Sequence, residues 1–294
     1  MFLQLLVNGL VTGSVYAIAA VGVSLVYGLL RLVNFAYGDM MAFGALITYG
    51  VNGPWHQSLI VAALAGMAAT AALALLLDFA LWKPLRSRRA GFMSMFLASI
   101  GLALVLRQAL LLFGSAQPRS FRVNPYRVFV LGSVRISEAQ LIAIVAAAAT
   151  IVVVALLLAY TTTGRVLRAM ADDRSLAAVA GINVERAIRI AWLSSGLLAG
   201  LAGVLAGLVE YSFDPNFGFQ LLLPVFAAVV LGGIGSAYGA LAGGLVLGVA
   251  QEVSTWSGFA GRVNPTYKPV VAFLVLTIAL LIRPQGFFGR ARIA

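Results

Sequence analysis

The sequence predicts an all-α, polytopic membrane protein with about eight or nine transmembrane segments, some of them short or broken. Of its 294 residues, 62% are hydrophobic and only 10% are charged, whereas about 25% of the residues in a soluble domain are charged. Apolar runs recur along the whole chain, and Lys and Arg gather in the short stretches between them. A chain with this much apolar surface can bury it only in a lipid bilayer.

Nine apolar runs account for most of the chain. A bilayer core about 30 Å thick is crossed by roughly 20 helical residues, so spans and their connections use up the length, and we expect a single membrane domain over 1–294. The runs are 2–30, 38–51, 58–82, 92–113, 138–160, 188–211, 221–233, 237–254 and 267–283. Runs 38–51 and 221–233 are too short for a complete helical span, which predicts half-helices or re-entrant elements there.

The distribution of basic residues predicts the orientation of the chain. Thirteen Lys and Arg residues fall on the side of the loop 83–89 and six on the opposite side, and cytoplasmic loops are enriched in positive charge. We therefore expect the N-terminus outside and the C-terminus in the cytoplasm. The outside loop 114–137, with a β-hairpin predicted around Gly132–Ser133, is either a solvated lid or a docking surface. Anionic lipid accounts for the net charge of +11, so no nucleic acid is expected as a partner.

The residues that usually carry catalysis are scarce. The chain has no cysteine and a single histidine, His56, in a short outside loop, so no metal site is expected. Its lysines, Lys83 and Lys268, follow aromatic residues instead of glycine, which excludes a phosphate-binding loop of the Walker A type. We expect a protein that is not an enzyme and that holds no cofactor of its own.

Polar side chains inside the spans are candidates for a functional role. Such groups are unfavourable in lipid unless they face protein or water. Asn8, Thr12, Asn34 and Asp39 are therefore predicted to line a polar cavity, although hydrogen bonds between helices explain them equally well. Four further charged residues lie nearer the ends of their spans and are interpreted as reaching the interface or pairing locally: Asp78, Arg107, Glu210 and Glu252.

The cytoplasmic loop 161–187 is the most informative connection. It contains a predicted two-turn helix, Asp173 to Ala180, with Asp172 as its N-terminal cap and Gly181 as its left-handed stop. The apolar face of this helix consists of Leu176, Val179 and Ala180. Because so short a helix is marginal in water, it needs a partner surface to hold it. The alternative is a helix that lies in the lipid interface, which the acidic residues disfavour.

Several segments of the chain, in order, carry a resemblance to a known family. They are Asn8-Gly9-Leu10 with Gly13 and Tyr16, then 34–39 (NFAYGD), 164–183 with Arg168, Asp173 and Gly181-Ile182-Asn183, 231–236 (LGGIGS) and 283–289 (RPQGFFG). Over nearly its whole length the chain resembles the permeases of branched-chain amino acid ABC importers, in particular the smaller of their two membrane subunits. The family usually has His and Glu at Tyr37 and Asp39, and often Glu-Ala-Ala at 175–177. If the acidic contact is kept, the resemblance assigns it to Asp172 or Asp173.

The resemblance also implies the other subunits of a complete importer. It implies a second homologous permease subunit, two cytoplasmic ATPase subunits that bind ATP and Mg²⁺, and a periplasmic solute-binding protein, assembled on the bacterial inner membrane. It also makes 161–187 the segment that couples to the ATPase, through Asp172, Asp173, Leu176, Val179 and Gly181. Asn8, Thr12, Asn34 and Asp39 then become candidates for the translocation path. The N-terminus and loop 114–137 would be periplasmic.

The expected function is translocation of Leu, Ile, Val or a related small polar solute. Two alternatives stay open, namely a permease for urea or short amides, and an ion-coupled secondary carrier. No series of carboxylates lies at mid-span, which weighs against a proton-coupled carrier.

Overall fold

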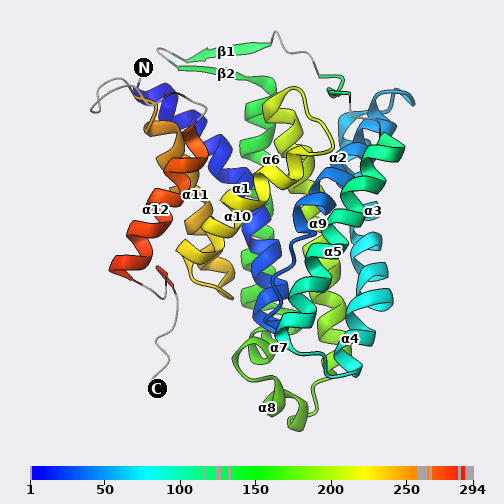
Figure 1. Ribbon diagram of the computed structural model, residues 1–294. Helices are drawn as coiled ribbons and strands as arrows, with labels where there is room; N and C mark the ends of the chain where they lie inside the picture. Colours follow the sequence, from blue (N-terminus) through cyan, green and yellow to red (C-terminus); the bar gives the residue numbers. More distant parts are fainter. Residues whose placement is uncertain are drawn as a thin grey trace.

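The computed structural model describes residues 2–114, 117–123, 127–131, 134–256, 264, 267–283 and 286–288. Its helices pack side by side as one elongated bundle (Figure 1). One end carries a β-hairpin and is called the hairpin end; α7 and α8 lie at the opposite end, called the α8 end. The elements are α1 (Phe2–Leu30), α2 (Tyr37–Asn52), α3 (Leu59–Leu77), η1 (Asp78–Trp82), α4 (Lys83–Ser87), α5 (Phe92–Gly114), β1 (Val128–Leu131), β2 (Val134–Ser137), α6 (Glu138–Tyr160), α7 (Thr162–Asp172), α8 (Arg174–Val179), α9 (Val184–Glu210), α10 (Phe217–Gly232), α11 (Ala237–Val253) and α12 (Lys268–Ile282).

The helices confirm the prediction of an all-α polytopic membrane protein. Five are long and apolar enough to cross a bilayer: α1, the continuous helix from α3 through the π-helical turn η1 to α4, α5, α6 and α9. The helices α10, α11 and α12 are apolar but shorter. Because the helical backbone satisfies its own hydrogen bonds, such segments are stable in lipid.

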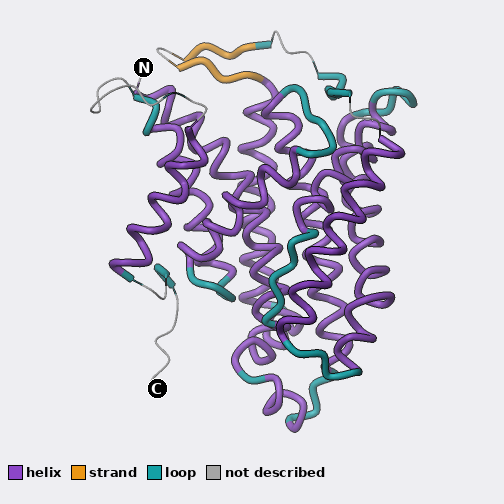
Figure 2. Tube along the Cα trace, viewed as in Figure 1, coloured by secondary structure: helices purple, strands orange, loops and turns teal. Residues whose placement is uncertain are grey.

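Two non-helical breaks interrupt the bundle, and each precedes one of the segments predicted to be short. Figure 2 shows the break 31–36 running up through the bundle from the end of α1 to the start of α2. The break 211–216 connects α9 to α10 in the same way. Both begin with a non-glycine residue in the left-handed region, Arg31 at φ 50° and Tyr211 at φ 58°. The predicted short segments are therefore helices that complete a broken crossing.

Two parts of the chain have the same architecture in opposite directions. In the first, α1 is followed by the break 31–36, by α2 and by α3; in the second, α9 is followed by the break 211–216, by α10 and by α11. The helix α1 runs from the hairpin end toward the α8 end, whereas α9 runs the other way (Figure 1). Packing follows the same relation. The helix α1 packs on α11, and its counterpart α9 packs on α3, which is the counterpart of α11. This arrangement is an inverted repeat.

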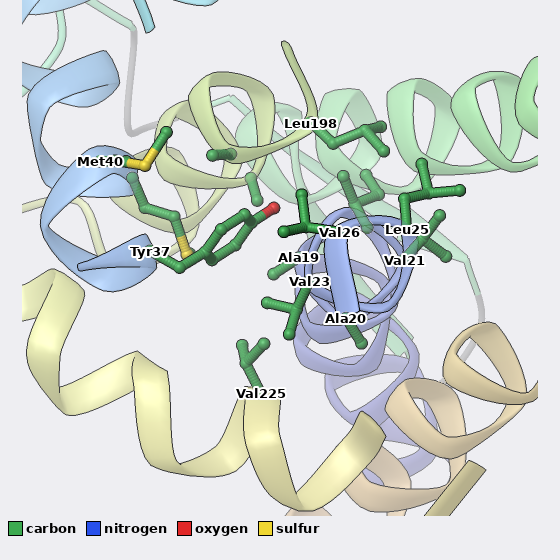
Figure 3. Packing of buried hydrophobic residues seen from close by; sticks show 14 of the residues in the cluster. Ala19, Ala20, Val21, Val23, Leu25, Val26, Tyr37, Met40, Leu198 and Val225 are labelled. Atoms are coloured by element: carbon green, nitrogen blue, oxygen red, sulfur yellow. The ribbon is translucent and has the colours of Figure 1, made fainter. Parts of the chain in front are cut away.

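The centre of the bundle is α1. In its most apolar stretch 89% of the residues are buried, against 17% in α5 and in α6. Figure 3 shows Tyr37 of α2 reaching into this core beside Met40, with its hydroxyl directed toward α1 and Leu198 of α9. A side chain at Gly22 would overlap that hydroxyl. The core is thus closed around α1, while α5 and α6 keep most of their surface for lipid or for partners.

Backbone hydrogen bonds form the hairpin and also hold the C-terminal segment against α10. The strands β1 and β2 pair antiparallel, with Val128 opposite Ser137, which confirms the predicted hairpin; its predicted turn, Gly132–Ser133, lies outside the described residues. At the α8 end, the N–H groups of Phe287 and Phe288 donate to the carbonyls at the end of α10, at 2.9 Å and 3.0 Å. Of the closing motif 283–289, residues 284, 285 and 289 lie outside the described part. So do three of the basic residues counted for the orientation, Arg262, Arg290 and Arg292.

Candidate functional site: two helix breaks and a membrane-embedded ion pair

The two breaks end in the same local structure. In the first, Asn34 Oδ1 accepts a hydrogen bond from the N–H of Ala36 at 3.1 Å. In the second, Asp214 Oδ1 accepts one from the N–H of Asn216 at 2.7 Å. Both are turns in which a short polar side chain binds the backbone two residues further on. Each turn directs the chain into the first residue of a helix.

The two helices that follow the breaks cross at a pair of glycines. Gly38 lies in the first turn of α2 and Gly218 in the first turn of α10. A Cβ atom on either glycine would overlap the backbone carbonyl of the other. Two helix N-termini, whose free N–H groups carry partial positive charge, therefore meet inside the bundle.

A charged pair lies directly beside this crossing. Asp39 of α2 accepts hydrogen bonds from Arg107 of α5, at 3.1 Å from Nε to Oδ1 and at 3.4 Å from Nη2 to Oδ2. The Asp39 side chain is 1% exposed and the Arg107 side chain 15%. Arg107 also contacts an aromatic ring: its guanidinium carbon lies 4.0 Å from the centre of the Phe219 ring, within the range of a cation–π contact.

Arg107 binds both halves of the inverted repeat at the same position. Asp39 follows Gly38 in the first half, and Phe219 follows Gly218 in the second. One half therefore contributes a carboxylate and the other an aromatic face to the same guanidinium. Removing a pair of charges from water is unfavourable, so ionised residues within a membrane bundle indicate a functional site.

The residues predicted to line the path fall in two places. Asn34 and Asp39 come together near the crossing, but both are buried, at 4% and 1% exposure, and both form hydrogen bonds within the protein. Asn8 lies toward the hairpin end, where it accepts a hydrogen bond from Gln4 at 3.1 Å. Thr12 is half-buried on α1. The structure thus separates the four residues into two pairs, and their role in the path stays a prediction.

Sequence reasoning missed Arg107 and Phe219 as members of this site. Arg107 was interpreted as reaching the interface or pairing locally; the structure shows it paired with Asp39, 68 residues away in the chain. The available signal was a lone arginine and a lone aspartate in two neighbouring spans. Phe219 carried no signal of its own, because an aromatic residue in an apolar run is ordinary.

Two more of the charged residues that the sequence analysis named in the spans also form ion pairs. Asp78 accepts a hydrogen bond from Arg86 at 2.7 Å near the α8 end. Glu252 of α11 accepts one from Lys268, the first residue of α12, at 2.6 Å. Both pairs connect residues close in sequence and need no ligand to explain them. Among the described residues, no group of three His, Cys, Asp or Glu side chains could hold a metal ion.

At the α8 end, the structure corrects the cap predicted for the short helix. Asp173, not Asp172, is the N-cap: its Oδ1 accepts hydrogen bonds from the N–H groups of Ser175 and Leu176 at 2.8 Å and 3.0 Å. Asp172 is the last residue of α7, a helix that the sequence analysis did not predict in this loop. The bond from the Ser175 hydroxyl at 2.6 Å, together with the two N–H groups, holds the pKa of Asp173 below its ordinary value. The carboxylate therefore stays ionised at neutral pH.

The remaining features of α8 match the prediction. Gly181 follows the helix in the left-handed region at φ 86°. Leu176 is 68% exposed and Val179 is 87% exposed, whereas Ala177 on the opposite face is buried. The helix thus presents two apolar side chains to the outside of the bundle. Such a face fits either a groove on another chain or the lipid interface, the two alternatives that the sequence left open.

Together the fold and the site define a class of protein. An inverted repeat whose broken helices meet within the membrane is the architecture of membrane transport proteins. The family described as "Branched-chain amino acid transport system / permease component" matches residues 5–280. The chain belongs to this family.

Individual proteins show the same relationship. The chain is 31% identical to the high-affinity branched-chain amino acid transport system permease protein BraD of Pseudomonas aeruginosa, over 99% of this chain and 97% of the relative. It is 29% identical to the permease protein LivH of Escherichia coli, with the same coverage. The fold resembles that of PsaBC from Streptococcus pneumoniae, with a TM-score of 0.50 and 16% identity over 98% of this chain and 94% of that one.

Proposed function

We propose that this chain is the membrane-spanning permease subunit of an ATP-driven importer that translocates branched-chain amino acids or a related small solute across the bacterial inner membrane. Membership of the permease family supports the class, and the names of the relatives support the substrate. The observation that carries the mechanism is the exposed apolar face of α8 at one end of the bundle.

The α8 end supplies the surface that a motor would need. The helix has six residues, too few to be stable in isolation. Its cap and its left-handed stop define its two ends, and Ala177 is buried against the rest of the protein, while Leu176 and Val179 point outward. An amphipathic helix of this kind fits a groove on a partner. We assign that groove to a cytoplasmic ATPase, so the α8 end is cytoplasmic and the hairpin end periplasmic.

The complete importer then brings this chain together with four kinds of partner: a second homologous permease subunit, two ATPases, a periplasmic binding protein and the lipid bilayer. ATP and Mg²⁺ belong to the ATPases, and this chain has no catalytic role of its own. The weakly buried faces of α5 and α6 leave room for the second permease. Movement of α8 would pass into α9, whose first residue follows α8 closely, and shift the bundle between its two open states.

The mechanism is tested by a substitution on α8. In Leu176→Arg, a charge replaces the apolar side chain that the ATPase groove would bury. An unpaired buried charge is unfavourable by several kcal/mol, so co-purification of a tagged ATPase should fall by about a hundredfold or more. Leu176→Met keeps the volume and the apolar character and is the matched control, for which we expect normal recovery. Undiminished recovery with Leu176→Arg would separate α8 from the motor and contradict the proposal.

A secondary carrier is the second candidate, because broken helices in an inverted repeat occur in that class as well. The two classes differ in what the purified permease does alone. Reconstituted without partners and given a proton or sodium gradient, a secondary carrier accumulates leucine. We expect no accumulation until the ATPase, ATP and the loaded binding protein are supplied.

A further inference from the structure

The Asp39–Arg107 pair lies at the edge of a membrane face that none of the described elements covers. This face is formed by α5 and α10, which are bridged by side chains: Arg107 contacts Phe219, and the ring of Phe35 contacts Phe96 of α5 and Phe226 of α10 at 5.4 Å and 5.3 Å between ring centres. The Phe219 side chain is 44% exposed. Arg107 therefore lies just beneath the surface of this face.

Two exposed polar side chains lie next in sequence to the two residues that meet at this face. Gln108 follows Arg107 on α5 and Gln220 follows Phe219 on α10, and both are exposed. Amide groups are unfavourable against hydrocarbon because their hydrogen bonds stay unmade. Polar residues at this depth face protein or a water-filled cavity instead. We place the aqueous space here, between this face and the second permease subunit of the proposed importer.

The guanidinium of Arg107 keeps hydrogen-bonding capacity toward that space. It has five N–H groups, and Asp39 accepts from two of its nitrogens. Asp39 itself is 1% exposed and cannot reach a ligand. The group presented to the aqueous space is consequently a fork of N–H donors with positive charge, which matches a carboxylate.

We propose that Arg107 binds the carboxylate of an amino acid in transit, and that Asp39 is the positioning residue that holds its guanidinium. This assignment rests on the proposed function and adds to it the substrate group that the chain contacts. A partly neutralised arginine suits a transit site, because its hold on a carboxylate is weaker than that of a free guanidinium and the solute can leave. The site also separates amino acids from urea and short amides, which carry no negative group.

The first test asks whether the pair acts on the solute or only on the fold. The complete importer is reconstituted in liposomes with ATP and a leucine-loaded binding protein, and leucine uptake is measured for Arg107→Met and for the double variant Asp39→Asn with Arg107→Met. The single variant leaves a buried carboxylate unpaired, whereas the double variant removes both charges. Since a charge-assisted contact is lost in both, we expect uptake to fall about tenfold or more in both.

A structural pair gives a different pattern. If Asp39 and Arg107 only stabilise the fold, the neutral double variant recovers uptake, and that result overturns the assignment. The double variant Glu252→Gln with Lys268→Met removes another ion pair of the spans and serves as the control; we expect it to keep most of its uptake. An unmodified importer that fails to take up leucine would contradict the proposed function instead, so the two failures are distinguishable.

The second test does not depend on whether the charge variants fold. The chain has no cysteine, so Gln108→Cys and Gln220→Cys each introduce a single thiol on the face. We expect both to react with a charged, water-soluble thiol reagent in the assembled importer, and excess leucine to slow the reaction. Leu274→Cys, in the middle of α12 at a position 55% exposed, is the control expected to face lipid and should stay unreactive. Unreactive thiols at both glutamine positions would show a face covered by lipid or protein and overturn the proposal.

Discussion

Single residues fix the centre of this molecule. At the crossing of α2 and α10, the absence of two side chains lets the backbones touch, and Gly38 and Gly218 each lie against the other's carbonyl. Beside them the one-residue difference between Asp39 and Phe219 makes the two halves of the repeat chemically unequal. Arg107 contacts both of these unlike residues, because it pairs with the Asp39 carboxylate and stacks on the Phe219 ring.

The glycine crossing leads to a stability prediction. Gly218→Ala forces a methyl group against the Gly38 carbonyl, and overpacking of this kind destabilises a protein by about 1–3 kcal/mol. Gly50→Ala on α2 is the matched control, because a Cβ there would meet no atom within 4 Å. Thermal unfolding of the purified permease should show a lower midpoint for Gly218→Ala and an unchanged or slightly higher one for Gly50→Ala. Equal midpoints would mean that the crossing is loose.

The turn at the second break supports another prediction at this scale. Asp214→Ala removes the side-chain acceptor for the N–H of Asn216, at an expected loss of about 1 kcal/mol in stability. Asp214→Asn keeps an acceptor oxygen, as Asn34 does at the equivalent turn, and should be tolerated. Denaturant titration of the two variants distinguishes these outcomes. A tolerated alanine would show that the break is shaped by packing alone.

At the scale of elements, the sequence predicted which segments form helices better than how those helices are connected and paired. The helix α1 matches the predicted run 2–30 and α6 matches 138–160, because long apolar runs with polar ends leave no alternative in a bilayer. The cap of α8 was assigned to the wrong acidic residue, since Asp172 and Asp173 are adjacent and only the length of α7 decides between them. The two breaks were visible in the sequence as shortened apolar runs. The sequence did not show that the helices after the breaks meet inside the bundle.

The corrected cap can be tested on α8 itself. Asp173→Ala removes the acceptor for two N–H groups, so the helix loses its preferred start and its docking face loses its fixed position. Co-purification of the ATPase should fall severalfold. Asp173→Ser keeps a capping oxygen and should retain most of the binding. If both variants bind as the unmodified permease does, the helix is held by the partner and not by its cap.

At the scale of the whole molecule, composition and spacing predicted the membrane fold, while long-range contacts stayed hidden. Asp39 and Arg107 are 68 residues apart in the chain, and no local pattern connects them. The inverted repeat was missed for a related reason: the two halves share geometry at the breaks, but only scattered identities such as Gly38 and Gly218. Packing in three dimensions can keep an architecture while most of its side chains change.

The orientation can be checked across the whole molecule. Single cysteines at Ser87 and Ala171 lie on exposed positions at the α8 end, and one at Ser120 lies exposed near the hairpin end. Because positive charge concentrates in the loops at the α8 end, membrane-impermeant thiol reagents should label Ser87→Cys and Ala171→Cys only from the cytoplasmic side. Ser120→Cys should be labelled from outside. The reverse pattern would invalidate the placement of the ATPase and of the binding protein.

The contact between Gly38 and Gly218 also limits how the bundle can move. Two half-helices that touch backbone to backbone share one pivot, and neither can tilt there without displacing the other. If α8 docks on an ATPase as proposed, a displacement of α8 would pass along α9 and through the break 211–216 to α10, and at the glycine contact it would displace α2. On this proposal, α2 and α10 would move together, and opening on one side of the membrane would be tied to closing on the other.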